Sequence, residues 1–65
     1  MKYTELHRII RENGWRPLPN RGKGSHILYE KDGVTFTVPL HKGKEIGNSF
    51  AKKLLLKLGI NQKSE

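Results

Sequence analysis

Apolar residues near the amino terminus recur at the spacing of an amphipathic helix. Leu6, Ile9 and Ile10 follow the i, i+3, i+4 pattern and form one apolar stripe. Thr4 offers a hydroxyl that can cap a helix, and the glycine of Asn13-Gly14 accepts the left-handed conformation that ends one. The pattern predicts a first helix that is capped by Thr4 and stops at Asn13-Gly14.

Three short segments after this helix have the features of β-strands. The first, residues 15–20, contains two prolines, which cannot donate to a strand ladder, so we expect a short or edge strand. The other two, residues 26–31 and 34–39, are separated by Asp32-Gly33, which is a strong hairpin signal. The three segments therefore predict an antiparallel meander.

Alternation along the two longer strands assigns their residues to faces. Val34, Phe36 and Val38 point to one face of the sheet, and Ile27 and Tyr29 can share it. The opposite face is then expected to carry His26, Leu28 and Glu30.

The carboxy-terminal part of the chain predicts a loop and a second helix. Residues 40–47 form a polar, basic loop, and Asn48 or Ser49 can cap the helix, which is expected to run to about Leu58. Gly59-Ile60 supplies the left-handed glycine and the hydrophobic contact of a Schellman motif. The apolar stripe of this helix is expected to comprise Phe50 or Ala51 with Leu54, Leu55 and Leu58.

The order of these elements predicts an α+β fold of the α-β-β-β-α type. Neither helix can bury its apolar stripe alone, and a three-stranded antiparallel sheet needs one face covered. We therefore expect both helices on one face of the sheet, with the other face open to a partner or to solvent. The chain, residues 1–65, is expected to be a single domain.

Composition narrows the functional classes. The chain has 65 residues, no cysteine and a formal charge of +7, from 13 Lys and Arg against 6 Asp and Glu. The size leaves no room for a buried small-molecule cofactor, and the lack of cysteine excludes disulfides and thiolate metal sites. No apolar run approaches a membrane span and no secretion signal is recognised, so we expect a soluble, cytoplasmic protein. The positive charge favours a polyanion such as nucleic acid, although a solvated lysine surface is an ordinary alternative.

Few side chains are suited to catalysis or metal binding. The carboxylates are scattered, and the three histidines lack the spacing of a metal site, so no metal is expected. His7 lies beside Leu6 but off the main stripe, which indicates a solvated or partly packed helix residue. His41 lies in a basic loop, where a phosphate-facing role and an ordinary loop role are equally plausible.

His26 follows a turn with distinctive chemistry. Gly22 and Gly24 flank Lys23, so the backbone can approach a ligand closely, and exposed amides there can bind an anion. Ser25 adds a hydroxyl, and His26 begins a strand on the face expected to be open. An imidazole with a pKa of about 6.5 exchanges protons in either direction near neutral pH. From the residues alone, a purely structural His26 is as plausible as a functional one.

Several distinctive motifs follow one another along the chain. They are Asn13-Gly14-Trp15, Lys23-Gly24-Ser25-His26, Tyr29, Asp32-Gly33, Val38-Pro39-x-His41 and Leu58-Gly59-Ile60. In this order they resemble the motifs of the HicA family, small toxins of HicA–HicB toxin–antitoxin modules, and the resemblance covers residues 3–60. The sequence departs from the family at Ile27, where a second histidine is often found, and at Pro17 and Pro19, which make the first strand poorer.

The resemblance implies a fold, an activity and a partner. Members of the family have a fold like that of double-stranded-RNA-binding domains. They act as mRNA interferases, which are endoribonucleases that block translation, and a HicB antitoxin holds them inactive. The functional histidine of the family corresponds to His26 in this sequence.

RNA supplies its own nucleophile, the 2′-OH, so a histidine can promote cleavage without a metal. The hypothesis is that His26 acts as general base on this hydroxyl or as general acid on the 5′-oxygen, with no second proton-transfer group evident. Lys52 and Lys53 are expected in the first turns of the last helix, where positive charges oppose the helix dipole. Their placement suggests contacts with RNA phosphates, and a solvated basic face is the alternative. The candidate RNA-binding residues are Lys23, Gly24, Ser25, His41, Lys42, Lys44, Lys52 and Lys53.

Two non-enzymatic functions remain compatible with this sequence. A non-catalytic double-stranded-RNA-binding module has the same fold and charge but needs His26 only for affinity. A structural ribosome-associated protein fits the size and charge but leaves the Gly-Ser-His turn without a role.

Overall fold

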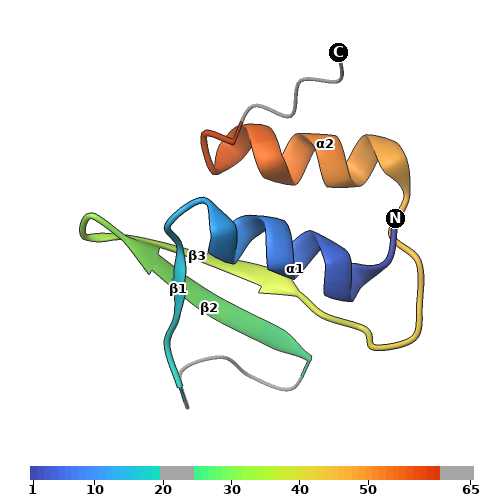
Figure 1. Cartoon of the computed structure of the whole chain (residues 1–65), viewed down its shortest axis with the longest axis horizontal. Helices are drawn as coiled ribbons and strands as arrows, with labels where there is room; N and C mark the ends of the chain where they lie inside the picture. The colour runs from blue at the N-terminus through green and yellow to red at the C-terminus, as the bar shows by residue number, and fades with distance from the viewer. Residues whose placement is uncertain (20–24, 61–65) are drawn as a thin grey trace.

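A computed structural model of the chain describes residues 1–19 and 25–60. The predicted α-β-β-β-α order is confirmed, with both helices on one side of a three-stranded antiparallel sheet. The helices run alongside each other in the same direction (Figure 1). The elements are helix α1 (Tyr3–Glu12), strands β1 (Arg16–Pro17), β2 (His26–Lys31) and β3 (Val34–Pro39), and helix α2 (Asn48–Lys57).

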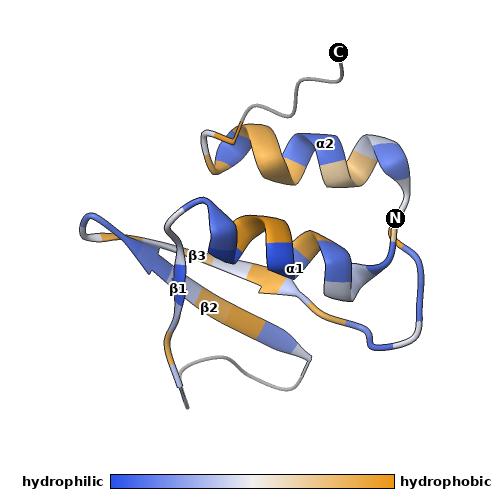
Figure 2. Ribbon diagram, in the orientation of Figure 1, coloured by the Kyte–Doolittle hydropathy of each residue, from blue (hydrophilic) through white to orange (hydrophobic). Residues whose placement is uncertain are grey.

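The sheet has the order β1-β2-β3, and its register confirms the predicted faces. Ile27 pairs with Val38 and Tyr29 pairs with Phe36, so these four side chains share one face. Tyr29 and Val38 are buried there, whereas the tip of the hairpin is mostly hydrophilic (Figure 2). Strand β1 contains only two residues and lies at the edge, as its prolines predict.

The turn between β2 and β3 has the backbone that its sequence predicts. Asp32 and Gly33 both have positive φ, of 51° and 83°, as a type I′ hairpin turn requires. The Gly33 amide donates to the Glu30 carboxylate at 2.9 Å, and the same carboxylate accepts from Arg16 on β1 at 2.8 Å. These contacts connect the turn to the edge strand.

The first helix begins earlier than the sequence indicates. Lys2, with extended φ and ψ of −81° and 149°, occupies the N-cap position, and Thr4 lies within the helix, so Thr4 is not the cap. The reason is a long-range backbone pairing, in which Lys2 forms an antiparallel bridge with Glu45. The Tyr3 amide donates to the Lys44 carbonyl at 3.3 Å, and this partner replaces a side-chain cap.

The N-cap of the second helix lies one residue before the first of the predicted caps. Gly47 occupies its N-cap position, and Asn48 is the first helical residue, so neither Asn48 nor Ser49 caps the helix. The Ile46 amide donates to the Met1 carbonyl at 2.8 Å, and the Ile46 side chain is buried although the segment is otherwise polar. Pairing between the two segments that precede the helices therefore sets where both helices begin.

Both helices end in a Schellman motif. After α1, the Trp15 amide donates to the Ile10 carbonyl at 3.4 Å, and after α2 the Ile60 amide donates to the Leu55 carbonyl at 2.8 Å. The intervening glycines, at positions 14 and 59, have φ of 96° and 76°. Trp15 and Ile60 are both buried, and the Trp15 indole N–H donates to the Leu58 carbonyl at 3.3 Å. The predicted helix ends are thus confirmed and are joined to each other.

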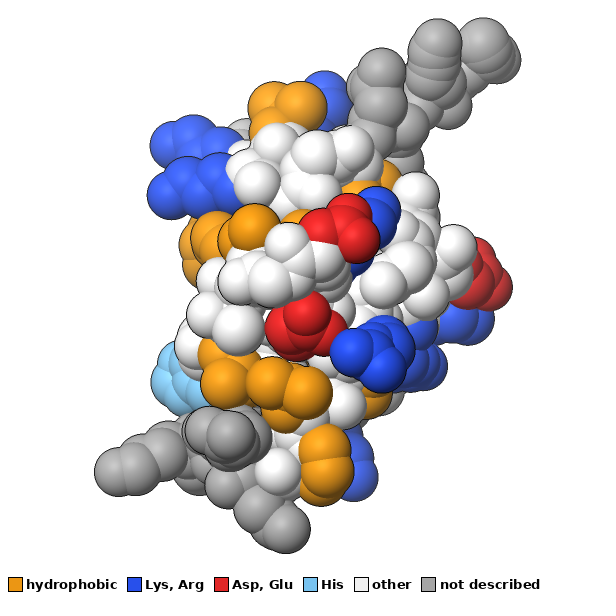
Figure 3. Space-filling view, turned by 90° about the vertical axis from the view of Figure 1, so that its left-hand side faces the viewer, with side chains coloured by type: hydrophobic (Ala, Val, Ile, Leu, Met, Phe, Trp, Pro, Cys, Tyr) orange, Lys and Arg blue, Asp and Glu red, His pale blue; other side chains and the backbone are white. Residues whose placement is uncertain are grey.

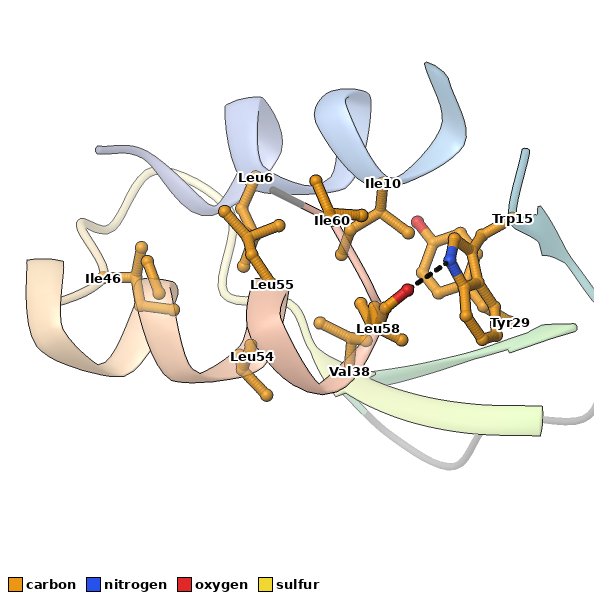
Figure 4. Packing of buried hydrophobic residues seen from close by; sticks show 11 residues of the cluster. Leu6, Ile10, Trp15, Tyr29, Val38, Ile46, Leu54, Leu55, Leu58 and Ile60 are labelled. Carbon is orange, nitrogen blue, oxygen red and sulfur yellow. Dashed lines mark hydrogen bonds between the residues drawn. The ribbon is translucent and has the colours of Figure 1, made fainter. Parts of the chain in front are cut away.

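A single hydrophobic core joins the helices to the covered face of the sheet. Figure 4 shows side chains from α1, α2, β2 and β3 meeting between these elements. Phe50 is 46 % exposed, so Ala51 and not Phe50 occupies the inward position at the start of the α2 stripe. Among the described residues, neither helix is long and apolar enough to cross a membrane. The core contains Leu6, Ile10, Trp15, Tyr29, Val38, Ile46, Ala51, Leu54, Leu55, Leu58 and Ile60.

Candidate active site

Strand register brings two histidine-bearing segments to one end of the sheet. His26, the first residue of β2, pairs with Pro39, the last residue of β3. The Leu40 amide donates to the Ser25 carbonyl at 2.6 Å and so extends this pairing by one position. In Figure 1 this end of the sheet lies beside the amino terminus of α1. We define the histidine end as Ser25, His26 and the turn 41–44.

The His26 side chain is exposed, as predicted. It follows the strand parity of Leu28 and Glu30, opposite to Tyr29, which is buried in the core. Leu28 is half-buried on this open side of the sheet. A ligand can therefore reach the imidazole of His26 without displacing core residues.

The glycine turn before His26 is only partly described. Gly22, Lys23 and Gly24, which the sequence predicts to approach a phosphate, lie outside the described residues. Ser25 is described and exposed, and its carbonyl is engaged by Leu40. The predicted anion-binding role of these amides stays a prediction.

His41 lies in an exposed turn directly after the sheet. The Lys44 amide donates to the His41 carbonyl at 3.1 Å, and Gly43 adopts the positive φ of 78° that this turn requires. The His41 ring packs edge-to-face against Tyr3, with ring centroids 5.0 Å apart and an interplanar angle of 88°. Lys42 and Lys44 are exposed on either side of Gly43. Three predicted RNA-binding residues thus share the turn at the histidine end.

Lys52 and Lys53 are exposed on α2, and helix α1 lies between α2 and β2 in Figure 1. Figure 3 shows lysine and arginine side chains projecting from the upper part of the molecule, where α2 lies. Because α2 begins at Asn48, both lysines follow the first turn, beyond which the helix dipole has little effect. The argument that these cations oppose the dipole is therefore wrong, and only their exposure supports a phosphate contact.

His7 is buried, contrary to the expectation of a solvated or partly packed residue. It is 2 % exposed, and its two ring nitrogens lie 2.6 Å from the Tyr29 hydroxyl and 2.8 Å from the Pro39 carbonyl. Because a carbonyl can only accept, Nε2–H donates to Pro39, and in the neutral ring Nδ1 then accepts from the Tyr29 hydroxyl. The signal in the sequence is the i, i+4, i+7 series of Tyr3, His7 and Ile10, which places His7 on the inward side of the helix.

Burial shifts the pKa values of both His7 and Tyr29. Desolvation lowers the pKa of His7 below 6.5, the hydrogen bond to Pro39 opposes this effect, and the charge of Arg11 adds to it. Burial also raises the pKa of the Tyr29 hydroxyl above 10, and Arg11 opposes that rise. A neutral His7 and a protonated Tyr29 are therefore the forms that the core favours near neutral pH.

Most of the described carboxylates are held in ion pairs. Glu5 and Glu12 both lie within 4 Å of Arg8, and Glu45 pairs with the terminal amine of Met1 at 3.2 Å. The hydrogen bond from Arg16, followed by that from the Gly33 amide, lowers the pKa of Glu30. Within residues 1–19 and 25–60, no three His, Cys, Asp or Glu side chains converge as a metal site requires.

Comparisons with known proteins identify the family. The sequence model of a protein family, described as the HicA toxin of bacterial toxin–antitoxin systems, matches residues 3–60. A protein of Pseudomonas fluorescens (strain Pf0-1) named probable mRNA interferase HicA is 33 % identical over 60 residues, which cover 92 % of this chain and 97 % of that protein. No solved structure matches the chain significantly. With the predicted motifs, the family model and this relative in agreement over nearly the whole chain, the protein belongs to the HicA family of toxins.

Proposed function

We propose that this protein is a metal-independent endoribonuclease that cleaves mRNA in the cytoplasm and so inhibits translation, with His26 as a catalytic residue. The observation that carries the proposal is the exposed His26 at the end of the sheet, in a basic chain of a toxin family. The name of the relative from Pseudomonas fluorescens supports the same activity. We propose that residues 1–65 act as one domain.

The proposed reaction uses the 2′-OH of RNA as nucleophile. The 2′-oxygen forms a bond to the adjacent phosphorus as the bond to the 5′-oxygen breaks, which leaves a 2′,3′-cyclic phosphate and a free 5′-OH. The imidazole of His26 either removes the 2′-OH proton or protonates the 5′-oxygen, a contribution worth roughly 10²–10⁴-fold in rate. Cations near the phosphate stabilise the charge that develops on its oxygens. The groups proposed to bind RNA phosphates are Lys23, Gly24, Ser25, His41, Lys42, Lys44, Lys52 and Lys53.

A HicB-like antitoxin is the proposed inhibitor. The open side of the sheet carries the half-buried Leu28 two residues from His26, so a protein that covers this side hides both. Binding of the native state also stabilises the toxin by mass action. We expect the amides around Leu28 to exchange more slowly with solvent in the complex, and protection confined to α1 and α2 would contradict this interface.

The activity is tested with His26→Ala and a matched control, Thr37→Ala. Thr37 is exposed and pairs with Leu28, so its substitution alters the same side of the sheet without removing an imidazole. We expect the wild type and the control to cleave mRNA in EDTA and to arrest growth on induction, and His26→Ala to do neither. Circular dichroism and thermal unfolding verify that all three proteins are folded.

Each alternative result has a definite meaning. Full cleavage by a folded His26→Ala protein removes His26 from the reaction. A wild type that binds structured RNA tightly but cleaves none supports the non-catalytic double-stranded-RNA-binding module instead. Cleavage that stops in EDTA and returns with a divalent cation contradicts metal independence.

A further inference from the structure

We infer that His41 is the second proton-transfer group of the proposed ribonuclease, acting with His26 on opposite sides of one phosphodiester; this inference rests on the proposed function. The reaction requires that one group take the proton of the 2′-OH and that another give a proton to the departing 5′-oxygen. A single imidazole leaves one of these transfers to water. A pair of imidazoles, one neutral and one protonated, carries out both, and the net proton count of the reaction is unchanged.

The register of the sheet supplies the first argument. His26 pairs with Pro39, and the Leu40 amide donates to the Ser25 carbonyl at 2.6 Å, so the strand pairing continues one position past His26. His41 is the next residue along the chain. His41 therefore lies in the turn directly after β3, at the same end of the sheet as His26.

The surroundings of His41 supply the second argument. Its ring packs edge-to-face on Tyr3, at a centroid distance of 5.0 Å, and this contact restrains the imidazole at the amino terminus of α1. Within residues 1–19 and 25–60, His7 alone among the histidines has ring nitrogens in hydrogen bonds. Tyr3 therefore orients the His41 ring without occupying the nitrogens that proton transfer needs.

The third histidine and the carboxylates of the described chain are unsuited to this role. His7 is buried, with both nitrogens engaged by Tyr29 and Pro39. Four of the five described carboxylates are in ion pairs, and the fifth, Asp32, lies in the hairpin turn at the far end of the strands. His26 and His41 are the two exposed imidazoles, and the sheet brings both to the same end.

The test compares His26→Gln and His41→Gln on two substrates. One is an RNA oligonucleotide that the wild type cleaves, and the other carries sulfur in place of the bridging 5′-oxygen at the same linkage. A thiol is far more acidic than an alcohol, so the sulfur leaves as a thiolate and needs no general acid. The variant that lacks the general acid therefore regains activity on the sulfur substrate alone.

We expect both variants to lose roughly 10²–10⁴-fold in kcat on ordinary RNA, with little change in KM. One of the two should approach the wild-type rate on the sulfur substrate, which identifies the general acid, and the other should stay slow. Lys42→Gln is the matched control from the same turn, since it removes a phosphate-binding charge. It should raise KM for both substrates by a similar factor.

Several results would overturn the inference. They are an unchanged kcat in His41→Gln, a loss confined to KM as in the control, or a failure of both variants to recover on the sulfur substrate. Thermal unfolding identifies a misfolded variant, and His41→Asn then serves as the alternative substitution. If the wild type cleaves no RNA, from which such an oligonucleotide could be chosen, the proposed function itself is refuted. If the wild type and His41→Gln cleave both substrates equally well, only the role of His41 is refuted.

Discussion

His7 connects the interior of the protein to the candidate active site. Its Nε2–H donates to the carbonyl of Pro39, and Pro39 is the residue that pairs with His26 across the sheet. In the neutral ring its Nδ1 accepts from the Tyr29 hydroxyl, and desolvation of the buried ring disfavours protonation. The buried imidazole thus stabilises the end of β3 through Pro39, and burial favours its neutral form over its charged form.

We expect the free energy of unfolding to fall as the pH is lowered below 6.5. The unfolded chain protonates His7 near its ordinary pKa of 6.5, whereas burial lowers the native pKa, so the unfolded state binds more protons in this window. Stability therefore rises with pH in this window. As the pH is lowered below 6.5, the free energy of unfolding falls by at most about 1.4 kcal/mol per pH unit until the lowered native pKa is reached. Arg11 adds to the effect, since its charge disfavours a protonated ring.

Urea unfolding of the wild type and of His7→Gln between about pH 8 and pH 5 measures this effect. Glutamine can donate to Pro39 but cannot take up a proton, so the variant is expected to be less stable at pH 8 and to have a shallower pH dependence. Glu30, whose pKa is lowered by Arg16, loses its contribution only below its ordinary value of 4.5, outside this window. Equal slopes for the two proteins would exclude His7 as the cause.

At the scale of elements, local residue patterns were sufficient for the strands and the helix ends but not for the helix beginnings. Asp32-Gly33 and the alternation on both sides of it depend on neighbouring residues, and the hairpin formed as predicted. The helix starts depend on the bridge between Lys2 and Glu45, which are far apart in the sequence. A capping rule that considers only adjacent residues selects Thr4 because it does not include this pairing.

The Schellman glycine after α2 offers a test of the backbone argument. An added Cβ at Gly59 meets nothing within 4 Å, so Gly59→Ala costs only the strain of a left-handed alanine, about 1–2 kcal/mol. Gly47 is the matched control, because it has equal space but a φ of −62°. Gly47→Ala is expected to change stability by less than about 0.5 kcal/mol, since lower chain entropy and a weaker N-cap offset each other. Chemical denaturation measures the free energy of unfolding of both variants. Equal losses of stability would contradict the assignment of Gly59 as a glycine required for its left-handed backbone.

At the scale of the whole molecule, the sequence predicted the layers of the fold and the exposure of His26 but not the arrangement of side chains. The burial of His7 requires Tyr29 and Pro39, which lie 22 and 32 residues away in the sequence. The contact between Tyr3 and His41 is equally long-range, so a loop histidine and a positioned histidine have the same local sequence. Motifs indicate which residues carry chemistry, and only the packed chain indicates which of them are brought together.

If the protein binds RNA as proposed, its net charge of +7 makes that binding dependent on salt, and the location of the charge predicts which lysines set the dependence. Two double variants test whether RNA spans the molecule from the histidine end to α2. In that case two phosphate contacts are lost when Lys42 and Lys44 are replaced with glutamine, and two others when Lys52 and Lys53 are replaced. Each pair should flatten the plot of log affinity against log salt by about 1.4, from ~0.7 per contact for single strands. Fluorescence anisotropy with labelled RNA, in a His26→Ala background that prevents cleavage, measures the slope.

The control replaces Arg16 and Glu30 together with glutamine. This change removes an ion pair without changing the net charge, and it should leave the slope unaltered. If the variant that lacks Lys52 and Lys53 has the same slope as the protein that retains them, the bound RNA is confined to the histidine end.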